Sequence, residues 1–115
     1  MIALNFYSDL YRDVLVTGRK TVTIRLGDKS AKYRDGEIVW VTVGQRFGRR
    51  QKLYSAIVDR VDVKRINELS RREIERENPE FRTAGDVANL LTRIYGEPIN
   101  ENHLVSVIHF SQVDE

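Results

Sequence analysis

Cysteine is absent from the sequence of 115 residues, and histidine occurs only twice, at His103 and His109. The absence of cysteine excludes disulfide bonds and metal sites built from thiolates. Two histidines alone cannot complete a zinc site, and carboxylates would have to supply the remaining ligands. We therefore expect no bound metal and no cofactor.

Long apolar segments are also absent, since no run reaches the roughly 18 apolar residues that span a membrane. The first residues, MIALNFYSDLYRD, lack the basic start and apolar stretch of a secretory signal peptide. A cytoplasmic protein with no membrane partner is expected. With 41% hydrophobic residues the chain can form an ordinary core, so residues 1–115 are expected to form one domain, as a monomer or weak dimer.

Charge is unevenly distributed along the chain, although the formal net charge is only +2. Residues 19–52 contain ten Lys and Arg against three Asp and Glu, whereas residues 66–101 contain five against eight. This asymmetry can attract an anionic partner such as RNA, although a solvated surface gives the same pattern. An aromatic ring among arginines could stack on a base, and a solvated hairpin tip is the alternative. The candidate RNA-contacting residues are Arg46, Phe47, Arg49 and Arg50.

The pattern of apolar residues and turn formers predicts five strands and three helices. The expected strands cover residues 2–6, 21–26, 37–44, 51–66 and 103–113, and the expected helices cover 8–18, 67–80 and 83–96. The strands outnumber the helices and do not alternate regularly with them, which argues against a doubly wound parallel sheet. A small, mostly antiparallel β-barrel with about three helices packed on it, in the α+β class, fits better.

Helix ends and core positions follow from local preferences. Side chains that can accept hydrogen bonds from first-turn amides predict where helices start, and glycine predicts where two of them end. The expected N-caps are Ser8, Asn67 and Thr83, the expected end residues are Gly18 and Gly96, a bend is expected near Ala56, and Trp40 and Ile94 are expected in the core.

The stretch TGRKTVTIRLGDK, residues 17–29, combines a strand pattern with a concentration of polar side chains. Strand alternation places Thr23 and Arg25, with Thr21, on one face, and Val22 and Ile24 on the other. Lys20 has the opposite parity from Thr23. Because it lies at the start of the strand and has a long side chain, a contact between Lys20 and Thr23 is allowed but not required by the spacing.

These residue types are compatible with nucleophilic catalysis. A threonine hydroxyl attacks a carbonyl only when a nearby base removes its proton. A lysine can be that base if burial or neighbouring positive charge, here from Arg19 or Arg25, lowers its pKa. Arg25 or a backbone amide could stabilise an oxyanion. Threonine is also a favoured strand residue, so an ordinary solvated strand face remains the alternative.

The run Gly18 to Arg25, GRKTVTIR, resembles the G-x-K-x-x-x-x-R signature of the ASCH domain superfamily, whose fold is a PUA-like β-barrel. Within this superfamily the sequence is most similar to the small bacterial N4-acetylcytidine amidohydrolases. The similarity continues through a DG turn into a strand at 35–39, ENPEF at 77–81, a helix ending in IYG, and V-I-x-F at 107–110. It covers nearly the whole chain in the same order.

The resemblance implies a role for each matching position. Lys20 would be the base, Thr23 the nucleophile and Glu77 the partner carboxylate, while Gly18 and Arg25 complete the signature at the substrate site. The implied reaction is hydrolysis of the exocyclic amide of N4-acetylcytidine to cytidine and acetate, without a metal. Tyr7 and Tyr11 are candidates for the wall of the substrate pocket, with core packing as the alternative.

Other interpretations stay open. The segment GQRFGRRQ, residues 44–51, is longer and more basic than in the similar enzymes, which leaves nucleoside, nucleotide and RNA as substrates. Glu77 taken alone fits an exposed residue on a charged helix. A non-catalytic RNA-binding module of the PUA-like kind and a ribonuclease of the same superfamily are the alternative functions.

Overall fold

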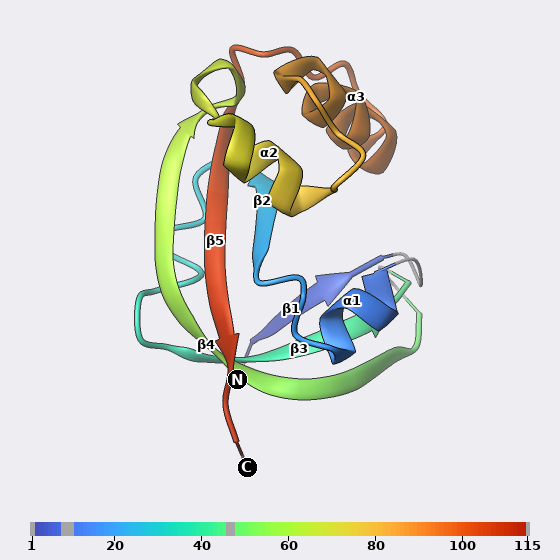
Figure 1. The fold of residues 1–115 in the computed structure, drawn as a ribbon, viewed down its shortest axis with the longest axis vertical. Helices are drawn as coiled ribbons and strands as arrows, with labels where there is room; N and C mark the ends of the chain where they lie inside the picture. Colours follow the sequence, from blue (N-terminus) through green and yellow to red (C-terminus); the bar gives the residue numbers. More distant parts are fainter. Residues whose placement is uncertain (1, 8–10, 46–47, 115) are drawn as a thin grey trace.

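A curled sheet shaped like half of a barrel organises the chain (Figure 1). The computed structural model describes residues 2–7, 11–45 and 48–114. Within them five strands pair in the order β1-β3-β4-β5-β2, and only β1 and β3 run parallel. The strands are β1 (Ala3–Phe6), β2 (Val22–Leu26), β3 (Ile38–Gly44), β4 (Arg50–Arg65) and β5 (Leu104–Gln112).

The curl of the sheet comes from β4, which has 16 residues and changes partner along its length. Its first half pairs with β3 and its second half with β5, and Ala56 and Ile57 pair with both. The register against β5 shifts between Val58 and Arg60, as in a β-bulge. The change of direction therefore lies where a bend was expected near Ala56.

Three α-helices accompany the sheet in the described part of the chain, which confirms the predicted α+β class. They are α1 (Arg12–Val16), α2 (Arg71–Glu77) and α3 (Ala84–Tyr95), and a 3₁₀ turn, η2 (Ile66–Glu68), precedes α2. None of these helices has the length and apolar character needed to cross a membrane. Figure 1 shows α2 and α3 at one end of the sheet and α1 beside β1 and β3.

The helix ends agree with the expectations at three of five positions. Thr83 caps α3, Gly96 ends it with a positive φ of 70°, and Gly18 follows α1 with a φ of 74°. The expected cap at Asn67 is wrong, because that residue lies within η2 and Ser70 caps α2 instead. The expected cap at Ser8 lies outside the described residues.

Two hydrophobic cores lie on opposite faces of β5. One fills the concave side of the half-barrel and includes Leu4, Phe6, Val41, Ile108 and Phe110. The other lies under α2 and α3 and includes Val22, Ile24, Ile74, Leu91 and Val107.

Two residues expected in the core are exposed. Trp40 is 42% exposed because its neighbours on β3, Val39 and Val41, point to the core and leave Trp40 on the other face. Ile94, in the last turn of α3, is 43% exposed, although the next residue, Tyr95, packs against the second core.

Candidate active site

The turn between α1 and β2 carries Lys20 to the site. Gly18 adopts the left-handed conformation that glycine tolerates best, and the Lys20 amide then donates to the Val14 carbonyl at 2.9 Å. This turn directs the Lys20 side chain into the protein, where the residue is only 3% exposed. Its direction is set by the turn and not by the two-residue period of the strand.

Lys20 forms a buried ion pair with Glu77, the last residue of α2. The Lys20 Nζ atom contacts the Glu77 carboxylate, and it also donates to the Glu77 carbonyl at 2.7 Å and to the Arg76 carbonyl at 3.4 Å. The rings of Tyr11 and Phe6 lie 4.9 Å and 5.9 Å from Nζ. Glu77 is thus buried, which differs from the exposed helix position that its local sequence suggested.

Burial lowers the pKa of Lys20 from its ordinary value of 10.5. The negative charge of Glu77 and its hydrogen bond act in the opposite direction, and the nearby positive charge of Arg25 lowers the pKa further. The neighbouring Tyr11 has a pKa raised above 10.0, by burial first and then by the charge of Glu77. Lys20 therefore loses its proton more readily than an exposed lysine does, and the neutral amine can accept a proton.

Thr23 and Arg25 lie on the face of β2 opposite Val22 and Ile24, as alternation predicted. The Arg25 Nε atom donates to Thr23 Oγ1 at 3.0 Å, and the guanidinium carbon lies 4.8 Å from the Phe6 ring centroid. Thr23 is buried, with 2% of its surface exposed. Lys20 and Thr23 both belong to the described residues, and no hydrogen bond joins them. The ammonium group of Lys20 is engaged by Glu77 instead.

Thr23 and Glu77 line the same small cavity of about 150 Å³, which we call the inner cavity. Aromatic and aliphatic side chains form most of its wall. The inner cavity is lined by Asn5, Phe6, Tyr7, Tyr11, Thr23, Ile24, Arg25, Glu77, Leu90, Leu91, Ile94 and Tyr95.

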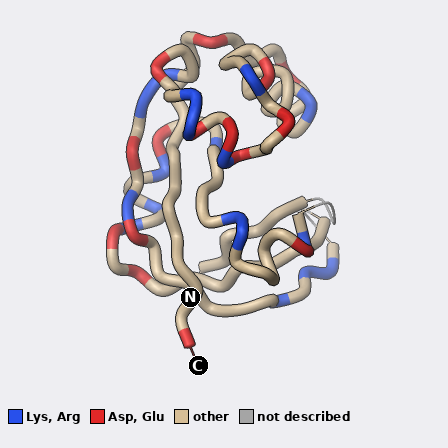
Figure 2. Tube along the Cα trace, in the orientation of Figure 1, with Lys and Arg blue, Asp and Glu red and all other residues tan. Residues whose placement is uncertain are grey.

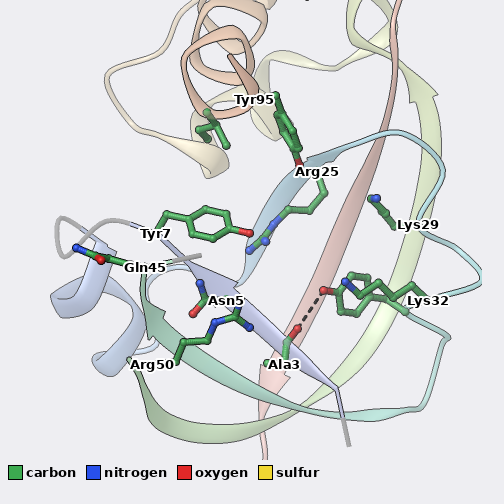
Figure 3. A pocket seen from close by; sticks show the side chains of 11 residues that line it. Ala3, Asn5, Tyr7, Arg25, Lys29, Lys32, Gln45, Arg50 and Tyr95 are labelled. Atoms are coloured by element: carbon green, nitrogen blue, oxygen red, sulfur yellow. Dashed lines mark hydrogen bonds between the residues drawn. The ribbon is translucent and has the colours of Figure 1, made fainter. Parts of the chain in front are cut away.

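A second space of about 470 Å³, the outer cavity, adjoins the inner one, since five residues line both. Figure 3 shows Tyr7 and Arg25 pointing into it, with Tyr95 on one side and Asn5 and Arg50 on the other. The shared residues are Asn5, Tyr7, Arg25, Ile94 and Tyr95.

Of the remaining candidate residues in the described part of the chain, only some line a cavity. Gly18 lines neither cavity, so its position in the motif is explained by the turn before Lys20. Arg50 lines the outer cavity, whereas Arg49 is exposed outside both. Arg46 and Phe47 lie outside the described residues. Figure 2 shows the basic segments before β2 and at the start of β4 below the helices α2 and α3, which carry both signs of charge.

Some lining residues were not singled out from the sequence. Asn5 is held in β1 by bonds to the Gly44 carbonyl and the Thr42 hydroxyl, and Lys29 and Lys32 come from the loop after β2. Tyr95 ends α3, and the IYG triplet at that helix end was the only sign of it in the sequence. Single polar or aromatic residues in loops and at helix ends carry no periodic signal that could identify them.

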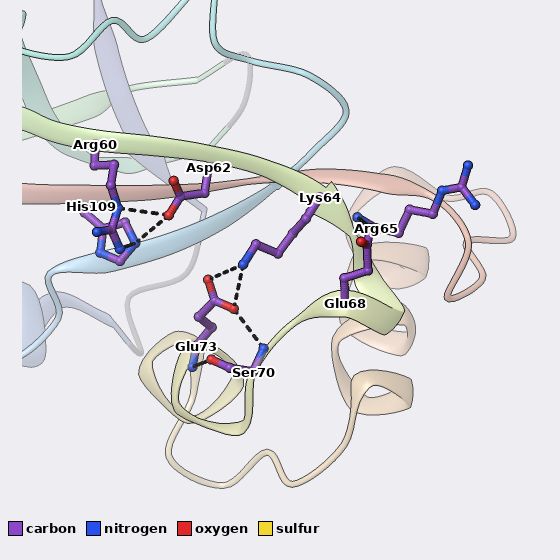
Figure 4. A network of polar contacts seen from close by, with 8 residues as sticks. All are labelled: Arg60, Asp62, Lys64, Arg65, Glu68, Ser70, Glu73 and His109. Carbon is purple, nitrogen blue, oxygen red and sulfur yellow. Dashed lines mark hydrogen bonds and ion pairs between the residues drawn. The ribbon is translucent and has the colours of Figure 1, made fainter.

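One group in the described part of the chain could supply metal ligands outside these cavities. Atoms of Asp62, Glu73 and His109 lie within 4.8 Å of one another. The carboxylates are already paired with cations, since Arg60 Nε lies 2.9 Å from Asp62 and Lys64 Nζ lies 3.1 Å from Glu73 (Figure 4). Burial and the charge of Arg60 lower the pKa of His109. We therefore interpret the group as a polar network that joins β4, β5 and α2.

No protein-family model and no curated protein matches the sequence, but solved structures resemble its fold. The chain is similar to an ASCH domain from Lactobacillus crispatus JV V101, with a TM-score of 0.66 and 17% identity over 96% of this chain and 77% of that chain. It is similar to protein EF3133 from Enterococcus faecalis V583, with a TM-score of 0.73 and 19% identity over 99% of this chain and 81% of that chain. For the hypothetical protein PH0355 the TM-score is 0.66, with 16% identity over 98% and 100% of the two chains. The chain therefore has the PUA-like fold of an ASCH domain, as the signature at Gly18 to Arg25 predicted.

Proposed function

We propose that the protein is an amidohydrolase that removes the acetyl group from N4-acetylcytidine. The observation that carries the proposal is the inner cavity, where a buried threonine and Glu77, the buried partner of Lys20, meet an apolar, aromatic wall. Ligand sites typically combine such a wall with a few placed polar groups. The rings of Tyr7, Tyr11 and Tyr95 are suited to stack on a planar pyrimidine.

In the proposed reaction, Thr23 Oγ attacks the acetyl carbonyl carbon. Arg25 already donates to this oxygen, so the hydroxyl proton is free to leave toward a base, and the guanidinium stabilises the negative charge that develops. The neutral amine of Lys20 accepts the proton, directly or through one water. The bond between the acetyl carbon and N4 then breaks, and N4 takes a proton from Lys20.

The second half of the reaction restores the enzyme. Water attacks the acetyl-threonine ester and gives one proton to Lys20. The bond between the acetyl carbon and Thr23 Oγ then breaks, Oγ takes this proton from Lys20, and the acetyl group leaves as acetic acid, which ionises to acetate. Glu77 holds the Lys20 side chain in place and balances its positive charge between the two steps. The residues of this chain supply every proton transfer.

The direct test is release of cytidine from N4-acetylcytidine by the purified protein and its Thr23 variants. Thr23→Val keeps the side-chain volume but lacks the hydroxyl, so kcat should fall by at least about a thousandfold. Thr23→Ser should restore part of the activity. Thr21→Val, on the residue that precedes β2, is the matched control and should remain active. Release by Thr23→Val at the wild-type rate would exclude the nucleophile, and no release by the wild type would exclude the function.

The pH dependence tests the role of Lys20. Since the neutral amine is the base, kcat/KM should rise with pH through the pKa of Lys20, and the inflection should lie below the ordinary value of 10.5 because burial lowers this pKa. Glu77→Gln removes the charge that opposes this shift and should move the inflection to lower pH. An activity that is unchanged by pH up to 10.5 would show that Lys20 does not act as the base.

A further inference from the structure

The outer cavity has a one-sided charge. Four cationic side chains line it, from Arg25, Lys29, Lys32 and Arg50, and no Asp or Glu is among the described residues that line it. The inner cavity differs, because the carboxylate of Glu77 lines it together with Arg25. An outer cavity of this composition favours an anionic ligand group.

The loop that carries two of these cations is held in a defined conformation. The Lys29 amide donates to Ser106 Oγ at 2.8 Å, and the same hydroxyl donates to the Gly27 carbonyl at 2.7 Å, so β5 anchors the loop on both sides of Asp28. The Lys29 carbonyl then accepts the amides of Lys32 and Tyr33. The two lysines are therefore presented by a turn that is fixed before any ligand binds, which reduces the entropy lost on binding.

Three of these cations, Arg25, Lys29 and Lys32, form no ion pair with a described Asp or Glu that would compete with a ligand. Within the described ranges no ion pair engages Lys29 or Lys32, and Lys32 Nζ lies 5.3 Å from the Tyr33 ring. Tyr33 itself is fixed by a hydrogen bond to the Ala3 carbonyl at 3.1 Å (Figure 3). Arg25 contacts a hydroxyl and an aromatic ring, neither of which carries a negative charge.

We propose that the outer cavity binds a phosphate group attached to the nucleoside whose base occupies the inner cavity. The inference rests on the proposed function for the identity of the base. Arg25 and Tyr7 line both cavities, so a ligand that spans them is contacted by the same side chains along its length. The preferred substrate is then a nucleotide or a nucleotide unit of RNA, which share this phosphate chemistry, and not the free nucleoside.

The test compares kcat/KM for N4-acetylcytidine, its 5′-monophosphate, its 3′-monophosphate and a short oligoribonucleotide that contains the modified base. At least one phosphorylated form should be preferred over the nucleoside by about tenfold, the value of one charge-assisted hydrogen bond. A preference for a mononucleotide identifies a nucleotide substrate, and a preference for the oligonucleotide identifies RNA. In Lys29→Gln/Lys32→Gln the preference should fall to within about twofold of unity.

A charge-matched control and a binding measurement separate this inference from the proposed function. Arg34→Gln/Arg71→Gln also removes two positive charges, at residues outside the outer cavity, and should keep the preference. Hydrolysis without any preference, or a preference that the Lys29/Lys32 variant keeps, would overturn the phosphate site. Cytidine 5′-monophosphate and cytidine are compared by titration calorimetry: tighter binding of the nucleotide that requires Lys29 and Lys32 supports the phosphate site even if no acetylated compound is hydrolysed. Equal binding together with no hydrolysis would overturn both.

Discussion

Lys20 serves two neighbours at once, because its ammonium group reaches both the carboxylate of Glu77 and the last carbonyls of α2. The final carbonyls of a helix have no partner within the helix, and a cation at this end also favours the helix dipole. A carboxylate at the same end would be unfavourable without that cation. The pair is therefore part of how α2 is attached to the sheet, in addition to its proposed chemistry.

A double-mutant cycle should reveal this coupling as a change in the free energy of unfolding. Lys20→Met and Glu77→Leu each leave one buried charge without its partner, and each should lower the stability by about 3 kcal/mol. The double variant replaces the pair with apolar side chains, so its loss should be smaller than the sum of the single losses by at least about 2 kcal/mol. Urea denaturation followed by circular dichroism gives the three differences.

The exposed pair Arg71–Glu75, in the same helix, is the matched control for this cycle. Its side chains are 76% and 44% exposed, and the coupling between them should stay below about 0.5 kcal/mol. If the losses at Lys20 and Glu77 are additive, so that their coupling energy is no larger than that of this control pair, the buried pair does not attach α2.

At the scale of elements, the turn at Gly18 determines which way the site lysine points. Strand alternation predicted the neighbours of Thr23 from the sequence, because β2 is regular and its period is two. It could not predict the partner of Lys20, since that partner lies 57 residues away and the turn, not the strand, orients the side chain. The burial of Glu77 could not be predicted from the local sequence either, because it depends on the same distant contact with Lys20.

Replacing Gly18 tests the turn alone. No heavy atom lies within 4 Å of the position that a Cβ would take, so Gly18→Ala meets no steric barrier and only the positive φ of 74° opposes it. The substitution should lower the stability by about 1 kcal/mol. Gly18→Asn, a residue that tolerates the left-handed conformation, should lose less. Equal thermal denaturation midpoints for Gly18→Ala and the wild type would show that the turn is not constrained as described.

Helix starts show what local sequence can decide. Asn67 and Ser70 are both suitable caps, and the structure uses Ser70, whose hydroxyl accepts the Glu73 amide while the Glu73 carboxylate accepts the Ser70 amide. The S-x-x-E spacing of this capping box is visible in the sequence and would have favoured Ser70. Thr83 and Asp86 form the same arrangement at α3, where the prediction is confirmed.

At the scale of the whole molecule, β5 separates two cores and contributes to both. On β5, Val105 and Val107 belong to the core under the helices, whereas Ile108 and Phe110 belong to the core of the half-barrel. The strand content and the absence of regular alternation were sufficient to predict an α+β barrel. The parallel pairing of β1 with β3 was not predicted, because it depends on how the curled sheet closes and not on any local pattern.

Since β5 contributes to both cores and the Lys20–Glu77 pair joins α2 to the segment before β2, the protein should unfold in one cooperative transition. Trp40, the single tryptophan, lies on β3 and reports the half-barrel by its fluorescence, while circular dichroism at the helix band reports mainly α2 and α3. The two signals should have the same denaturation midpoint. Leu91→Ala, in the core under the helices, should cost about 2–5 kcal/mol and lower both midpoints equally. A fluorescence midpoint that stays at the wild-type value in this variant would show instead that the two cores unfold separately.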